Sequence, residues 1–128
     1  MIRIKILKLV LLFQGLYYSL TAIWAIVSLE SFSRITQHFG DPFEMYSIAG
    51  LALALGLFFL FSSRREELLR PVGFLALGSA IAVIIPEIIF LPREGNPPLF
   101  WADFVEEVLV AVILAGALFK GRNKFPNN

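Results

Sequence analysis

Long apolar stretches separated by short polar segments dominate the pattern of this 128-residue chain. Crossing about 30 Å of hydrocarbon takes roughly 20 helical residues at 1.5 Å each. Four stretches meet that length, at approximately residues 6–29, 46–63, 72–91 and 100–119. The pattern predicts an all-α fold, a polytopic bundle of four transmembrane helices that forms one membrane domain over residues 1–128.

Composition supports a membrane protein, because 58% of the residues are hydrophobic and the mean hydropathy is +0.77. Both values lie far from those of an ordinary soluble domain. The chain has no cysteine, which excludes disulfides and thiol chemistry. The first apolar stretch is longer than the core of a signal peptide and lacks a small-x-small cleavage site, so we expect it to remain as a span.

The basic residues predict the orientation of these spans. All but Arg34 and Arg93 of the 11 lysines and arginines fall on one side of a four-span arrangement. The positive-inside rule then places both termini and the 64–71 loop in the cytoplasm, and the 30–45 and 92–99 loops outside.

The acidic residues have the opposite bias. All but Glu66 and Glu67 of the 10 aspartates and glutamates fall in the outer half. The positive-inside rule says little about acids, so this excess needs another explanation. A negative outer half would concentrate protons, divalent cations or cationic substrates at that face.

The last apolar run is too short to span a membrane without acidic residues. Val108 to Phe119 covers only about 18 Å, so a crossing must include Asp103, Glu106 and Glu107. At 100° per residue these side chains fall within an arc of about 100°. Exposure of that arc to lipid would be costly, so we expect it to face the bundle interior.

A solvated helix entry is the alternative for these three acids. Pro97 and Pro98 mark a helix start just upstream. Acids in the first turns of a helix interact favourably with its positive end, and near the membrane surface they can reach water. The sequence leaves both interpretations open.

Glu87 is a fourth acid at a similar depth. The run from Val72 to Ile85 covers only about 21 Å, so the third span must continue through Pro86 and Glu87. Glu87 then lies near the C-terminal end of a helix, where the helix dipole disfavours an anion. We therefore expect it to hold a proton or to have a partner.

The first span has a polar stripe that predicts the opposite wall of a pocket. Its members recur at spacings of three and four residues and are Gln14, Tyr17, Tyr18, Thr21, Ala25 and Ser28. Such side chains turn inward and hydrogen-bond across helices, which can serve packing alone. Together with the acids, the stripe predicts a polar cavity that opens outward, with Trp24 and Trp101 as anchors near the outer interface.

Small residues four apart predict where helices approach closely. The pairs are Gly50/Ala54, Ala52/Gly56, Ala76/Ala80, Gly78/Ala82 and Ala111/Ala115. They do not distinguish contacts within one chain from contacts between copies.

The predicted function is binding of a lipid-like or cationic small molecule. The candidate ligand-binding residues are Glu87, Asp103, Glu106, Glu107, Gln14, Tyr17 and Tyr18. Clustered carboxyl groups cannot all ionise cheaply, so at least one proton is expected to be shared. Such a group also suits a membrane-embedded isomerase that uses acid and base catalysis, a proton-coupled transporter, or an accessory subunit without chemistry of its own.

The sequence offers no conventional cofactor motif. His38 is the only histidine, and no zinc spacing or phosphate-binding glycine loop is present. We therefore expect no cofactor and no metal, although an oxygen-rich carboxylate site is also suited to a hard cation. Expected partners are membrane lipids, a hydrophobic or cationic small molecule and a second copy of the chain, with no nucleic acid.

Three short motifs resemble those of a family of small, functionally uncharacterised bacterial four-helix membrane proteins. Gly15-Leu16-Tyr17-Tyr18, with Thr21 and Trp24, resembles their first helix. Gly78-Ser79-Ala80 leading to Glu87, and Asp103 followed by Glu106, resemble their later acidic positions. The layout is also distantly similar to DoxX-like and EXPERA-type membrane proteins. The resemblance implies a ligand pocket and a bacterial plasma membrane location, and it transfers no activity.

Overall fold

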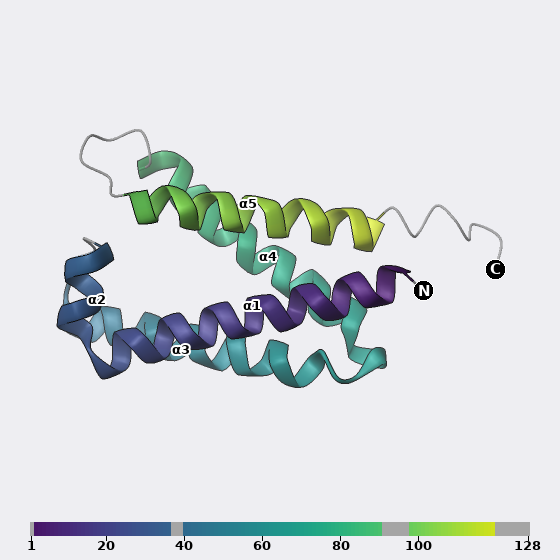
Figure 1. Cartoon of the computed structure of the whole chain (residues 1–128), viewed down its shortest axis with the longest axis horizontal. Coiled ribbons are helices and arrows are strands. Elements are labelled where there is room, and N and C mark those ends of the chain that lie inside the picture. The colour runs from purple at the N-terminus through teal and green to yellow at the C-terminus, as the bar shows by residue number, and fades with distance from the viewer. Residues whose placement is uncertain (1, 37–39, 91–97, 120–128) are drawn as a thin grey trace.

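The structure, a computed structural model, describes residues 2–36, 40–90 and 98–119 and is all-helical over these ranges (Figure 1). The helices are α1 (Ile2–Val27), α2 (Leu29–Thr36), α3 (Pro42–Ser62), α4 (Glu66–Phe90) and α5 (Pro98–Phe119). Four of them correspond to the predicted spans, but their ends differ by up to six residues, because α4 already begins at Glu66 within the predicted 64–71 loop. The all-α prediction is confirmed.

Three of the helices, α1, α3 and α4, are long and apolar enough to cross a membrane. This finding confirms the prediction of a helical membrane protein. Helix α5 has 22 residues, but Asp103, Glu106 and Glu107 fall within every 18-residue stretch of it. It is therefore long enough to span but more acidic than an ordinary transmembrane helix.

The prediction of a loop at 30–45 was wrong in part, because α2 occupies residues 29–36 and α3 already begins at Pro42. Helix α2 packs back on the end of α1. The Trp24 ring meets the Phe32 ring edge to face at 5.1 Å, and the Trp24 indole donates to the Ser31 hydroxyl at 3.3 Å. Leu29, Phe32 and Ile35 recur at the helical spacing of three residues, but eight residues are too few for a search for membrane spans to detect. The contact with Trp24 stabilises this short helix.

Helix α3 has a capped start that its sequence explains. The Asp41 side chain accepts a hydrogen bond from the Glu44 amide at 3.2 Å, which satisfies one of the free amides at a helix N-terminus. Pro42 occupies the first helical position, where its missing amide has no consequence.

Helices α1 and α3 touch through their backbones at two glycines. A Cβ atom added to Gly56 would lie 2.8 Å from the Ser19 amide nitrogen and 2.9 Å from the Gly15 carbonyl oxygen. A Cβ on Gly15 would lie 2.8 Å from the Gly56 carbonyl oxygen. Because these distances are shorter than van der Waals contact, only glycine allows the two helices to come this close.

The four long helices form two pairs, since α1 packs most extensively on α3 and α4 on α5. The main apolar core joins both pairs and includes Leu11, Phe59, Ala76, Leu114 and Leu118. A much smaller apolar cluster lies near the other end of α1, around Ala22, Ala25 and Ala49. In keeping with this asymmetry, α1 and α5 are closer at the start of α1 and diverge toward its end (Figure 1).

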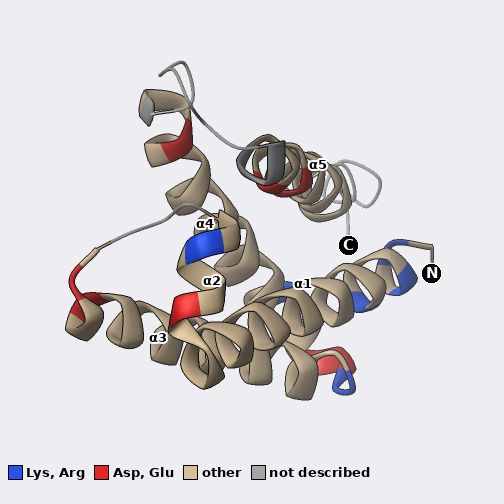
Figure 2. Cartoon of the chain, turned by 60° about the vertical axis from the view of Figure 1, so that its left-hand side comes forward, with Lys and Arg blue, Asp and Glu red and all other residues tan. Residues whose placement is uncertain are grey.

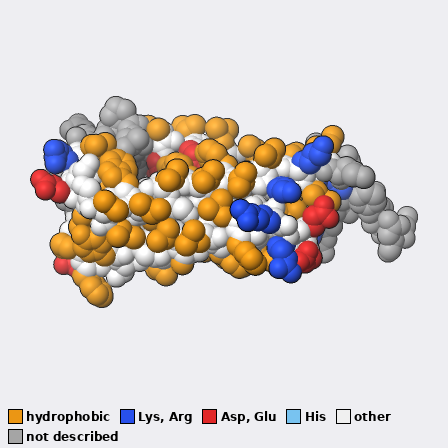
Figure 3. Space-filling view, turned by 60° about the horizontal axis from the view of Figure 1, so that its bottom comes forward, with side chains coloured by type: hydrophobic (Ala, Val, Ile, Leu, Met, Phe, Trp, Pro, Cys, Tyr) orange, Lys and Arg blue, Asp and Glu red, His pale blue; other side chains and the backbone are white. Residues whose placement is uncertain are grey.

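The surface has the distribution expected of a protein in a bilayer. Hydrophobic side chains cover the middle of the visible face, and lysine and arginine gather mostly at the end where α1 begins (Figure 3). Many large apolar side chains are exposed, including Leu9 at 64% and Leu109 at 56%. An apolar surface of this extent is typical of helices that lie in a bilayer.

Candidate functional site

Three carboxyl groups of α5 converge inside the bundle. Helical spacing puts Asp103, Glu106 and Glu107 on one side of α5, and their carboxylate oxygens lie within 4.8 Å of one another. Glu107 is only 1% exposed, and the other two are half-buried. A fully solvated helix entry does not describe Glu107.

Helix α1 contributes the polar groups that meet these acids. The Tyr17 hydroxyl donates a hydrogen bond to Asp103. The Gln14 side chain, which has no exposed area, donates through Nε2 to Glu107 at 3.4 Å, a long hydrogen bond. The Tyr18 hydroxyl lies close to Glu107 and Gln14.

Helix α4 supplies the fourth acid. Glu87 is 7% exposed, and its side chain lies close to Asp103. Figure 2 shows the acidic positions of α4 and α5 along these two helices. We call Glu87, Asp103, Glu106 and Glu107 the acidic cluster. The structure thus brings all seven candidate ligand-binding residues to one region between α1, α4 and α5.

Several oxygens in this region are buried without a hydrogen-bond partner among the described residues. They are both carboxylate oxygens of Glu106, Glu87 Oε1, Gln14 Oε1 and the Tyr18 hydroxyl. A buried polar atom without a partner costs about 1–3 kcal/mol, and more when it carries a charge. So many in one place indicate a site that is completed by protons, water or a ligand.

No basic side chain of α1, α4 or α5, as far as these helices are described, lies at the depth of the cluster. Arg3, Lys5 and Lys8 lie in the first turns of α1, and Arg70 lies near the start of α4. Arg34 on α2 pairs instead with Glu30 at 3.5 Å on the exposed surface. Arg93 lies outside the described residues.

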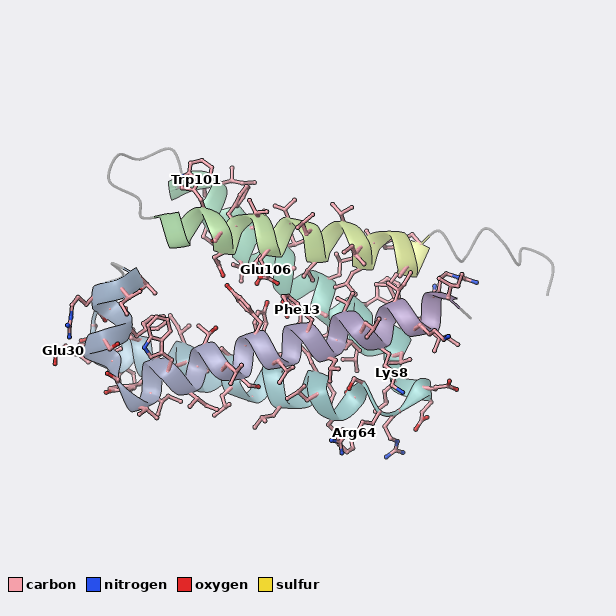
Figure 4. The ribbon with its side chains drawn as sticks, in the orientation of Figure 1. Lys8, Phe13, Glu30, Arg64, Trp101 and Glu106 are labelled. Atoms are coloured by element: carbon pink, nitrogen blue, oxygen red, sulfur yellow. The ribbon has the colours of Figure 1, made fainter. Side chains whose placement is uncertain are left out.

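A groove of about 680 Å³ runs between α1 and α5 on the surface of the bundle. Its walls include Leu9 and Phe13 of α1 and Val105, Leu109 and Ile113 of α5. Among the described residues that line the groove, Glu106 is the one acidic residue. Figure 4 shows Glu106 and Phe13 in the region where α5 and α1 face each other.

The geometry suits a cation. Two oxygen ligands on opposite sides of a Ca²⁺ ion, each at about 2.4 Å, are about 4.8 Å apart. The carboxylates of α5 could therefore surround a hard metal ion, an ammonium group or a shared proton. His38, the remaining metal-ligand candidate, lies outside the described residues.

Sequence reasoning did not identify the groove. Its walls consist mainly of apolar side chains on the outside of the bundle, and no periodic signal distinguishes them from the other apolar residues there. Ser19 and Ser62 were also missed, although their hydroxyls are buried without a hydrogen-bond partner among the described residues. Both serines lie away from the apolar groove lining, in or near the α1–α3 contact.

Comparison with known proteins gives no match: no family model, curated protein or solved structure is similar to this chain. The resemblance to DoxX-like and EXPERA-type proteins therefore stays a prediction. Any functional statement has to come from the site itself.

Proposed function

We propose that the protein spans the plasma membrane four times, with both termini in the cytoplasm, and that its acidic cluster binds a cationic or lipid-like small molecule. The proposal rests on one observation above the others. Three carboxylates of α5 lie within 4.8 Å of one another in the interior, where both Glu106 oxygens lack a hydrogen-bond partner among the described residues. A bound cation would satisfy these oxygens and offset their mutual repulsion.

The neighbouring groups support binding of an organic ligand. Gln14 and Tyr18 each present a buried oxygen without a hydrogen-bond partner in the described chain, and Tyr17 fixes Asp103. Hydrogen-bonding groups beside a charged centre fix the orientation of a ligand as well as its affinity.

The topology is tested by single cysteines, because the natural chain contains none to interfere. With a membrane-impermeant maleimide, Glu44→Cys is expected to react in intact cells, and Glu67→Cys only after permeabilisation. Labelling of Asn128→Cys tests whether α5 crosses the membrane. If Asn128→Cys does not react with the reagent in intact cells, the result supports four spans, whereas a reaction in intact cells would show that α5 does not cross.

Ligand binding is tested by native mass spectrometry of the gently solubilised protein. We expect wild type to retain a discrete extra mass and Glu87→Gln/Asp103→Asn to retain at least about tenfold less, since a lost charge-assisted contact is worth about 1.5–3 kcal/mol. Glu30→Gln is the matched control, because Glu30 is an exposed acid outside the cluster. Equal retention by wild type and the double variant would contradict the assignment.

A membrane-embedded isomerase is the second candidate. It is favoured by the Tyr17–Asp103 hydrogen bond beside Glu87, which places proton donors and acceptors from three helices together. Turnover of a lipidic substrate that is lost in both Asp103→Asn and Glu87→Gln would support catalysis. If the lipidic substrate binds without turnover, ligand binding alone remains the proposed function.

A further inference from the structure

Glu106 belongs to both the α1–α5 groove and the acidic cluster. It contributes to the groove lining, yet its carboxylate oxygens have almost no exposed area. The side chain therefore separates the apolar groove from the other acids, with its carboxylate turned toward them. A change in its side-chain torsions would bring the Glu106 carboxylate to the groove.

We infer that the ligand is an amphiphilic amine, which enters from the bilayer through the α1–α5 groove, leaves its apolar tail there and places its cationic head at Glu106. This inference rests on the proposed function and names the class of ligand. It also states the route, which runs sideways from the membrane and not down from the aqueous phase.

The groove fits an apolar tail. Its lining on α5 extends from Trp101 to Ile113, about 18 Å along the helix axis. Its volume of about 680 Å³ lies within the range of small-molecule sites. Leu109 and Ile113 lie deeper along α5 than Glu106, so a tail can follow the helix while the head stays at the carboxylate.

The acidic cluster fits the head. A neutral lipid chain would fill the groove without satisfying either Glu106 oxygen, and an anionic head would be repelled by Asp103 and Glu107. An ammonium group offers the missing positive charge and, if protonated rather than quaternary, hydrogen-bond donors for these oxygens. Charge complementarity therefore favours an amine over other amphiphiles.

The test measures retention of defined probes by native mass spectrometry in a neutral detergent. The probes are dodecylammonium, methylammonium and dodecanol, which separate head from tail. Two variants narrow the groove from opposite walls, Leu9→Trp and Leu109→Trp. Leu57→Trp on α3 is the matched control, because Leu57 is similarly exposed at 53% and lies outside the groove lining. Thermal unfolding in the same detergent verifies that each variant is folded.

Wild type is expected to retain dodecylammonium at least about tenfold better than either other probe, because both head and tail contribute. Leu9→Trp, Leu109→Trp and Glu106→Gln should each reduce that retention about tenfold, and Leu57→Trp should leave it unchanged.

Other outcomes would overturn the inference in distinguishable ways. If wild type retains methylammonium as well as dodecylammonium, and neither tryptophan variant has an effect, the acidic cluster remains a site for small cations and the groove has no role. If wild type retains dodecanol as well as the amphiphilic cation, and Glu106→Gln has no effect, the groove holds ordinary lipid chains. If no probe binds and Glu87→Gln/Asp103→Asn matches wild type, the proposed function fails as well.

Discussion

Replacing Gly56 with leucine is expected to separate α1 from α3 and to reduce the stability of the fold by about 3 kcal/mol or more. The added side chain has no free space, since even its Cβ would lie 2.8 Å from the Ser19 amide nitrogen and 2.9 Å from the Gly15 carbonyl oxygen. Both are backbone atoms, so no rotamer change relieves the clash. Thermal unfolding in detergent, followed by circular dichroism, measures the loss.

Gly50→Ala is the matched control on the same helix. A Cβ at Gly50 meets nothing within 4 Å, and alanine is about 1 kcal/mol more favourable than glycine in a helix interior. We expect this variant to unfold at or above the temperature of wild type. Similar losses at Gly50 and Gly56 would show that the two helices do not meet as described.

Glu106→Gln/Glu107→Gln is expected to stabilise the protein without ligand by about 1–3 kcal/mol and to abolish ligand retention. The double variant removes two ionisable carboxyl groups that lie within 4.8 Å of each other and of Asp103, and with them the cost of burying whatever charge they carry. Glutamine keeps the shape of the side chain and an oxygen that can accept from Gln14. The Tyr17–Asp103 hydrogen bond is untouched.

This combination of gained stability and lost binding distinguishes a functional site from a structural one. If the acids serve only to hold α5 in place, the double variant would unfold at a lower temperature than wild type. Glu30→Gln provides the baseline, because its exposed ion pair with Arg34 is worth at most about 1 kcal/mol. The two temperatures are compared in the same detergent at the same pH.

The long helices could be predicted because hydropathy and length are local properties. A search for long apolar spans passes over helix α2, because it has only eight residues, and the contact of Phe32 with Trp24 helps to hold it in place. The small-residue pairs were a partial guide to packing. Gly56 marks a close contact, whereas Gly50 and Gly78 face open space. A pattern of small residues shows where an approach is allowed, and the partner helix decides where it occurs.

The acidic cluster was predictable in part because the spacing of residues along one helix is also a local property. Spacings of three and four residues on one helix bring Asp103, Glu106 and Glu107 together whatever the bundle looks like. Their meeting with Tyr17 and Gln14 depends on how α1 and α5 cross, and a polar stripe alone does not specify that. The groove depends entirely on this crossing, so the sequence contains no sign of it.

The uneven placement of the two apolar cores has a mechanical consequence. The larger core joins both helix pairs near the cytoplasmic ends in the proposed topology, and the outer ends of α1 and α5 diverge. If the α1–α3 and α4–α5 pairs moved apart, they would therefore pivot about their contact in the inner leaflet. The cross-section of the protein would increase in the outer leaflet alone. This motion would have to displace lipids of the outer leaflet against their lateral pressure. Tighter lipid packing in that leaflet would therefore oppose access to the acidic cluster.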